Sequence, residues 1–354
     1  MKLYYKLSTT FVLTFCAALL GCGNTSKVPP DQPETPENPD QPAQYADSVA
    51  LLDGYPSGVE VRYFRDYYSA EEDEYCSGYI ALIDFAANPK IAFNAVHLPE
   101  AATPTAAFAS FGNASRRQLV ATNAGYFWAG ESLSLLIHNS VVESIASNYA
   151  YVTVRNATKT VYPVRAALGR SNSGAFEAKW VYCCMDDDSR PYAFPSPLEN
   201  NEKNKSYLRT PPTSKTEGAE LWQPQEAVGG GPMIVYGGEN VAETYYWREV
   251  LDEGGTAGLS RQPRTAAGAT ADGKMLLLVC DGRGSNDSGG YTLAEVADVL
   301  IGLGAVVAVN LDGGGSSTMV GIDGKVLNRP SDTGESESIV QRSVPTAIII
   351  TEEN

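Results

Sequence analysis

Residues 305–320 read AVVAVNLDGGGSSTMV and form the most informative stretch of the chain. The first half is apolar and rich in β-branched residues, which predicts a buried strand. Asp312, three glycines and three hydroxyl side chains follow where that strand must end. Consecutive glycines cost conformational entropy and pack nothing, so a chain keeps them where backbone turns sharply or lies against a ligand. On residue types alone, a tight turn capped by Asp312 fits as well as a ligand loop does.

A second apolar run, KMLLLVC at residues 274–280, also ends in an Asp-Gly corner, at Asp281 and Gly282. Between the two runs, the sequence TLAE at residues 292–295 has the pattern of a capping box and predicts the start of a helix over residues 293–303. Glycines at the end of this segment are typical of a helix C-terminus. Strand, helix and strand together predict a β-α-β unit over residues 274–312.

Parallel strands joined by a helix end at the same edge of a sheet. We therefore expect Asp281 and Asp312 at neighbouring carboxyl ends, in a crevice where open α/β sheets bind ligands. Arg283 follows the first of these corners directly. The fold class predicted for the whole is α+β (mixed α/β), with a central mixed β-sheet and helices packed on it.

Four sequence blocks resemble the phosphodiester glycosidase family, and they occur in the order seen in that family. They are residues 123–127 (NAGYF), 264–268 (RTAAG), 281–283 (DGR) and 310–319 (NLDGGGSSTM). The last block is the most specific of the four. The family often has phenylalanine at the position of Tyr126.

The resemblance implies a hydrolase that cleaves the bond between the anomeric carbon of a sugar and a phosphodiester. In that case Asp312 or Asp281 serves as nucleophile or general base, and Arg264 and Arg283 hold the phosphate. The other residues predicted to bind a phosphorylated glycan are Asn123, Gly125, Gly313, Gly314, Gly315, Ser316 and Ser317. Further candidates for the site are Gly230, Gly231, Thr292 and Arg342.

Two alternatives stay open from the sequence. One is a glycan-binding surface lipoprotein without catalytic activity. The other is a metal-dependent phosphodiesterase in which Asp281 and Asp312 bind magnesium or calcium. The glycosidase interpretation requires no cofactor. Two histidines, in no recognisable setting, give no support to a serine-histidine-aspartate triad.

The composition limits the class of partner. A formal net charge of −16 argues against nucleic acid and against anionic membrane surfaces. A phosphate site in so acidic a chain must be built locally, and arginines beside the glycine-rich blocks provide the charge for it. The length of 354 residues leads us to expect a single domain over residues 47–354, with an insertion near residues 171–221.

The first 46 residues predict a cell-envelope address. Residues 1–21 resemble a signal peptide, and LLGC at residues 19–22 resembles a bacterial lipobox, which implies acylation of Cys22. From residue 22 to 46, prolines recur every third residue among acidic side chains, which predicts an extended tether. We expect a lipid anchor, with the outer membrane favoured, and no other contact with the membrane.

Overall fold

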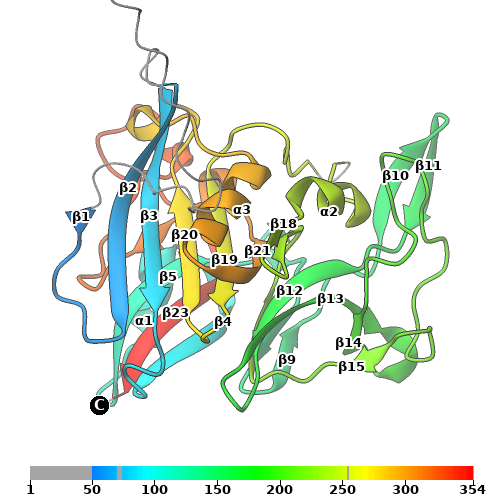
Figure 1. Ribbon diagram of the computed structural model, residues 1–354, viewed down its shortest axis with the longest axis horizontal. Helices are drawn as coiled ribbons and strands as arrows, with labels where there is room; N and C mark the ends of the chain where they lie inside the picture. Colours follow the sequence, from blue (N-terminus) through cyan, green and yellow to red (C-terminus); the bar gives the residue numbers. More distant parts are fainter. Residues whose placement is uncertain (1–49, 70–73, 253–254, 354) are drawn as a thin grey trace, which may run out of the picture. The chain divides into compact units, whose positions relative to one another are not determined.

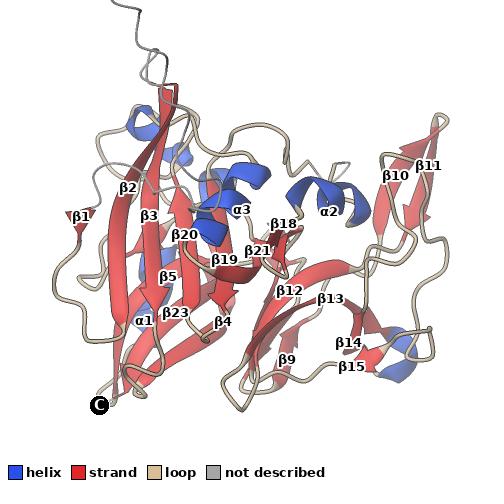
Figure 2. Cartoon of the chain, viewed as in Figure 1, coloured by secondary structure: helices blue, strands red, loops and turns tan. Residues whose placement is uncertain are grey.

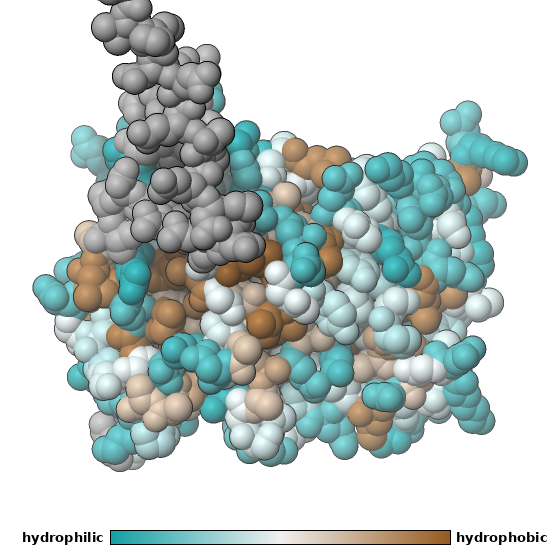
Figure 3. Space-filling model, viewed as in Figure 1, coloured by the Kyte–Doolittle hydropathy of each residue, from teal (hydrophilic) through white to brown (hydrophobic). Residues whose placement is uncertain are grey.

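The structure, a computed structural model, describes residues 50–69, 74–252 and 255–353. These residues belong to one compact unit. Strand accounts for 44% of the structure and helix for 13%, so the α+β class holds in its coarse form but strands dominate it (Figure 2). The predicted signal peptide, Cys22 and the tether lie outside the described residues. Figure 3 shows hydrophilic side chains spread over the visible face, with smaller apolar patches between them.

The largest sheet has eight strands within the described residues, and each strand pair in it is antiparallel. Its order is β1 (Ala50–Leu51), β2 (Val59–Ser69), β3 (Glu74–Ile83), β20 (Met275–Cys280), β19 (Arg264–Thr270), β21 (Ala305–Asn310), β17 (Met233–Tyr236) and β18 (Glu239–Asn240).

The predicted strand, helix and strand over residues 274–312 are β20, α3 (Leu293–Gly302) and β21. Both strands run antiparallel to β19, so they are parallel to each other and end at the same edge, as predicted. They are not neighbours, however, because β19 lies between them (Figure 1). The first residue of β19, Arg264, therefore lies at the edge where the other two strands end.

Strand β20 is a continuous apolar run because both faces of the sheet are covered. Leu277 and its alternate neighbours pack into the main core, with residues from the other sheets. Leu276 and Leu278 point to the opposite face, where they pack with Val296 and Leu300 of α3. The period of two along the strand therefore assigns successive side chains to two separate cores.

Two further sheets complete the main core. One has the order β22 (Met319–Val320), β5 (Arg116–Asn123), β23 (Val344–Glu353) and β4 (Ile91–Ala102). The other has the order β15 (Glu220–Leu221), β14 (Arg190–Phe194), β13 (Phe176–Cys184), β12 (Arg165–Arg170), β16 (Glu226–Gly229), β8 (Leu136–His138) and β9 (Val141–Ser144). Two small hairpins are separate from these sheets, β6 (Phe127–Trp128) with β7 (Glu131–Ser132) and β10 (Ala150–Val154) with β11 (Ala157–Val161).

The segment predicted as an insertion, residues 171–221, is built into the core of the fold. It contains β13, β14 and β15, and it contributes Trp180 and Phe194 to the main hydrophobic core. Its irregular composition hid these strands, because turns rich in proline, aspartate and asparagine separate them.

The other helices are short, α1 (Pro104–Phe111) and α2 (Ala242–Arg248), besides the 3₁₀ turns at Met185–Asp187, Ser285–Asp287, Gly314–Ser316 and Ser331–Thr333. The capping box predicted for α3 is present: the backbone N–H of Glu295 donates to Thr292 Oγ1 at 3.2 Å, and the N–H of Thr292 donates to Glu295 Oε2 at 2.8 Å. Among the residues that the structure describes, no helix is long and apolar enough to cross a membrane.

Glu249, directly after α2, joins the two larger sheets from a fully buried position. Its carboxylate accepts hydrogen bonds from the backbone N–H of Met233 at 2.8 Å, the N–H of Ala166 at 2.8 Å and Trp180 Nε1 at 2.9 Å. Burial raises the pKa of Glu249 to about 7, although these donors and Arg165 act in the opposite direction. The charged form of this side chain is therefore costly near neutral pH.

We predict that the protein loses thermal stability as the pH rises from about 4.5 to about 7, partly through Glu249. A carboxyl whose pKa is raised by folding stabilises the folded state fully below its unfolded pKa, and this contribution disappears as the pH rises through the folded pKa. For Glu249 the loss is about 3 kcal/mol, at about 1.4 kcal/mol per pKa unit. Melting temperatures of wild type and Glu249→Gln at pH 4.5 and 7.5 measure it. The variant is expected to lose part of the pH dependence, and an unchanged slope would contradict this role.

Candidate functional site

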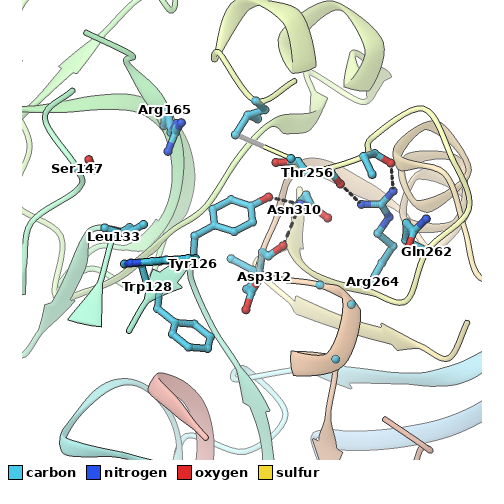
Figure 4. Close-up of a pocket in the computed structure, with 18 of the residues that line it drawn as sticks. Tyr126, Trp128, Leu133, Ser147, Arg165, Thr256, Gln262, Arg264, Asn310 and Asp312 are labelled. Atoms are coloured by element: carbon cyan, nitrogen blue, oxygen red, sulfur yellow. Dashed lines mark hydrogen bonds between the residues drawn. The ribbon is translucent and has the colours of Figure 1, made fainter. Parts of the chain in front are cut away.

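A pocket of about 480 Å³ lies where the polar edge of the eight-stranded sheet meets the segment before β10 and the first residue of β12. On one side it is lined by Tyr126, Trp128 and Arg165, and on the other by Gln262 and Arg264 (Figure 4). The end of β21 at Asn310 and the loop that follows it, to Gly315, form the part between them. Figure 4 shows Asp312 between these two walls.

Four backbone-directed hydrogen bonds hold the loop after β21 in place. The N–H of Asp312 donates to the carbonyl of Ala124 at 3.0 Å, and Asn123 Nδ2 donates to the carbonyl of Asp312 at 2.6 Å. The N–H of Leu311 donates to Thr265, and that of Gly314 donates to Pro263 at 2.9 Å. The loop is thereby pinned to the end of β5 and to the start of β19.

Two glycines of this loop stand where a side chain would not fit the backbone conformation or the space. Gly314 has φ +61°, a left-handed conformation that favours glycine. A Cβ atom on Gly313 would lie 2.8 Å from the carbonyl oxygen of Pro263. Gly313, Gly314 and Gly315 all line the pocket, so the loop is both a tight turn and a pocket wall.

Asp312 is the one carboxylate that lines the pocket within the described part of the chain. Burial raises its pKa to about 6, and a hydrogen bond with Ser316, the charge of Arg342 and the N–H of Gly313 act in the opposite direction. A carboxylate with a pKa in this range can accept a proton from water, or attack as a nucleophile, near neutral pH.

Four arginines line the same pocket: Arg165, Arg264, Arg283 and Arg342. They come from β12, β19, the loop after β20 and the segment before β23. The charge of the pocket lining is therefore positive, although the chain as a whole has a net charge of −16. Guanidinium groups are suited to bind phosphate oxygens, so the pocket is suited to an anionic ligand.

The guanidinium of Arg264 is mostly occupied by the protein itself. Its Nε donates to the carbonyl of Tyr291 at 3.0 Å, Nη1 to Thr256 at 3.0 Å, and Nη2 to Ala257 and Ser260 at 2.8 Å each. Four of its five N–H groups are thus used on backbone carbonyls. Arg264 was predicted to hold phosphate, but its contacts show that it mainly fixes the loop over residues 256–260.

The other three arginines keep more donors available. Arg165 donates from Nε to the carbonyl of Glu249 at 3.3 Å and from Nη2 to that of Val250 at 3.1 Å. Arg283 donates from Nε to Gln262 Oε1 at 2.8 Å, and its side chain is otherwise exposed. Arg342 forms a two-pronged pair with Asp332, at 2.9 and 3.0 Å. Their remaining N–H groups are the ones suited to bind a phosphate.

Asp281 does not line the pocket, and its side chain is buried. Its Oδ1 accepts from Asn328 Nδ2 at 3.0 Å and from the N–H of Arg329 at 2.8 Å, and its Oδ2 accepts from Asn286 Nδ2 at 2.7 Å. Burial raises the pKa of Asp281 to about 6. The predicted catalytic role is corrected on this geometry: Asp281 joins two loops and presents no free oxygen to a substrate.

A family model for the phosphodiester glycosidases matches residues 120–351. The chain belongs to this family. N-acetylglucosamine-1-phosphodiester alpha-N-acetylglucosaminidase is 42% identical to it in Bos taurus and 41% in Homo sapiens, each over 69 residues. These stretches are 20% of this chain and 12% and 13% of those proteins. The SPbeta prophage-derived uncharacterized protein YomE of Bacillus subtilis is 38% identical over 72 residues, 20% of this chain and 11% of that protein.

Solved structures support the fold over most of the chain. The zebrafish N-acetylglucosamine-1-phosphodiester alpha-N-acetylglucosaminidase catalytic domain, auto-inhibited by its pro-peptide, matches with a TM-score of 0.57 and 19% identity, over 87% of both chains. A hypothetical protein from Synechocystis matches with a TM-score of 0.52 and 18% identity, over 87% of this chain and 64% of that one. At these identities the matches establish the fold alone.

Several residues of this phosphodiester glycosidase domain that were predicted to bind substrate support the fold around the pocket instead. Asn123 is buried outside the pocket, where it holds the Asp312 backbone and accepts from Thr265 Oγ1 at 2.9 Å. Gly125 packs so closely that a Cβ atom would lie 2.4 Å from Ser134 Cβ. Ser316 and Ser317 are buried outside the lining, although Ser316 bonds with Asp312. These residues support the pocket from behind.

The four further candidates divide in the same way. Arg342 lines the pocket, as predicted. Thr292 caps α3 and lies outside the pocket lining. Gly231 also lies outside the lining, but its carbonyl accepts hydrogen bonds from two residues that line the pocket. The Cβ that Gly230 lacks would lie 2.2 Å from the carbonyl oxygen of Asn310, so this glycine allows two segments to approach closely.

Pocket residues that sequence reasoning missed include Arg165, Trp128, Asn310 and, as a polar group, Tyr126. The hydroxyl of Tyr126 donates to the carbonyl of Gly231 at 2.6 Å and accepts from Asn310 Nδ2 at 2.8 Å, and burial raises its pKa to about 12. Asn310 Oδ1 is buried without a hydrogen-bond partner in the described structure. An unused acceptor beside a pocket is suited to a ligand hydroxyl.

Proposed function

We propose that the pocket hydrolyses the bond between the anomeric carbon of a sugar and a phosphodiester. One observation carries the proposal: a carboxylate with a raised pKa, Asp312, shares a pocket with four arginines and with no other charged side chain of the described chain. The family of the domain supports a glycosidase that acts on phosphodiesters. The proposed natural substrate is a sugar-phosphate-sugar diester, such as an N-acetylglucosamine-1-phospho-sugar.

Hydrolysis at the anomeric carbon needs a base or nucleophile more than it needs an acid. The bond from carbon to the phosphate oxygen breaks, and a water oxygen bonds to the anomeric carbon, either directly or after Asp312 has occupied it. In the direct route the proton of that water passes to Asp312. The phosphate leaves with its negative charge, and the free guanidinium donors of Arg165, Arg283 and Arg342 stabilise this charge. Glycosidases usually use two carboxyl groups, but a leaving group that is already acidic makes the second less important.

The two alternatives from the sequence fit the geometry less well. Metal-dependent cleavage was based on Asp281 and Asp312 as shared ligands, and these two carboxylates do not share the pocket. A glycan-binding protein without turnover does not require a carboxylate with a raised pKa in the pocket. For localisation we keep the prediction from the sequence, a lipid anchor at Cys22 in the cell envelope.

The proposal is tested with a synthetic sugar-1-phosphate diester in water labelled with oxygen-18. We expect free sugar to be released, with the label in the sugar and none in the phosphate, because the bond to carbon breaks. Label in the phosphate would show cleavage on the phosphorus side and would favour the phosphodiesterase alternative. Binding without release of sugar would favour the glycan-binding alternative.

We predict that kcat/KM for this reaction rises with pH through about 6 and then levels. The ionised form of Asp312 is the active one, and its raised pKa places the change there. Below that pH, kcat/KM should fall about tenfold per pH unit, since this parameter reports groups of the free enzyme. A profile between pH 4 and 8 measures it. An acid limb at about 4, the usual value for an aspartate, would contradict the assignment.

A further inference from the structure

Three exposed aromatic side chains extend from the pocket wall towards solvent. Trp128 and Tyr149 line the pocket, yet 77% and 51% of their surfaces are exposed. Tyr151 is 62% exposed and contacts Tyr149 edge-on, with ring centroids 5.4 Å apart and an angle of 67° between the ring planes. We call Trp128, Tyr149 and Tyr151 the aromatic rim. Single exposed aromatic residues are common, but two exposed rings that line one pocket, with a third in contact with one of them, are typical of a binding surface.

Short, tightly turned elements present the aromatic rim. Trp128 pairs with Glu131 across a two-residue turn whose central residues, Ala129 and Gly130, have φ of 50° and 86°. Positive φ at both positions is typical of the turns that close the tightest hairpins. The backbone that carries Trp128 is held in this way, so it loses little entropy when a ligand packs on the ring.

The second hairpin, β10–β11, is anchored through its inward face. Val152 and Val161 are buried and pack with Val250, which comes directly before the loop that forms the far wall of the pocket. Strand alternation then places Tyr151 on the outward face. The exposure of this tyrosine is therefore fixed by the fold of the hairpin.

We propose that the aromatic rim binds a sugar ring that is attached to the alcohol oxygen of the phosphodiester. This inference rests on the proposed function, because it places the anomeric carbon at Asp312 and the phosphate among the arginines. The second ester of the phosphate then leads out of the pocket. Figure 4 shows Trp128 across the pocket from Arg264, with Asp312 between them.

The chemistry of the rim selects a sugar over other occupants. A pyranose ring has a face of C–H groups that packs on a tryptophan or tyrosine ring and hydroxyls at its edge that stay in water. Tyrosine and tryptophan are suited to such half-wet contacts, since each has an apolar body and a polar tip. The rim residues carry no charge, whereas the four arginines of the pocket supply the positive charge that binds phosphate. The rim is thus a specificity subsite for the part of the substrate beyond the phosphate.

The test compares two diesters of the same sugar 1-phosphate, one with a methyl group and one with a hexose on the alcohol side. We expect Trp128→Ala and Tyr149→Ala each to raise KM about tenfold for the hexosyl diester and to leave KM for the methyl diester within about twofold. Trp128→Phe should retain most of the affinity for the hexosyl diester. Met185→Ala is the matched control, since Met185 is 70% exposed and does not line the pocket.

Calorimetry gives the same comparison without turnover. It measures the binding of both diesters to Asp312→Asn, with Trp128 present and with Trp128 replaced by alanine. Tighter binding of the hexosyl diester that depends on Trp128 supports the proposal. If replacement of Trp128 weakens binding equally for both diesters, or weakens it for neither, the proposal is overturned. Turnover of the methyl diester by wild type would then still support the proposed function. Failure of wild type to bind or cleave either diester would overturn both. A diester with a nucleoside on the alcohol side that binds more tightly than the hexosyl one would overturn the assignment to a sugar.

Discussion

Replacing Asp312 by asparagine is expected to lower kcat about 10³-fold or more while the protein keeps its fold. Asparagine has nearly the same shape and preserves the backbone bonds that pin this loop to Ala124 and Asn123. It removes the one carboxylate that lines the pocket among the described residues, and with it the group that the proposal uses as base or nucleophile. Since burial raises the pKa of Asp312, its ionised form is costly at pH 7.5, and the variant should melt at the same temperature or slightly higher.

The matched control is Asp281→Asn. Asp281 also follows a strand, is buried and has a raised pKa, but its oxygens accept from Asn328, Arg329 and Asn286. An asparagine can keep the two bonds at Oδ1, and the exposed Asn286 can turn its amide to meet the new one. We therefore expect kcat within about threefold of wild type. Sugar release under saturating substrate, with melting curves for both variants, checks the pair. An equal loss of kcat in Asp312→Asn and Asp281→Asn would show that Asp281 also takes part in the reaction.

Local signals made the core of the fold predictable. The apolar runs of β20 and β21 and the capping box at Thr292 each lie within a few residues of sequence, and the structure confirms them. The position of β19 (RTAAGAT) between these two strands was not predicted, because the propensity of a segment to form a strand does not show which strands become its neighbours in a sheet. Its small residues are required by close neighbours, since a Cβ on Gly268 would lie 2.9 Å from the carbonyl oxygen of Val307.

The site was predictable only where a motif marked it. Asp281 and Asp312 carry the same local pattern, a strand followed by Asp-Gly, and the sequence could not separate them. The difference arises from Asn328 and Arg329, which close over Asp281 from 47 and 48 residues further along the chain. Arg165 lies in no motif, and only the packing of β12 beside the large sheet brings it to the pocket.

The second large effect is expected at Arg264. Replacing it with methionine should lower the free energy of unfolding by at least about 3 kcal/mol and abolish most activity. The reason is structural, because four carbonyls, at Tyr291, Thr256, Ala257 and Ser260, would lose their charged donor in a buried place. The loop over residues 256–260 then loses the hydrogen bonds that fix it, and the wall of the pocket that this loop forms is no longer held in place.

Arg283→Met is the variant that separates this role from phosphate binding. Arg283 lines the same pocket but is exposed, and within the described structure its side chain has one hydrogen-bond partner, Gln262. Its loss should raise KM about tenfold, since one charged contact to the phosphate is removed, and should leave denaturant unfolding unchanged. Urea unfolding curves and KM values for both variants decide the matter. If Arg264→Met unfolds like wild type and only raises KM, Arg264 holds phosphate directly, and the loop over residues 256–260 is fixed by other contacts.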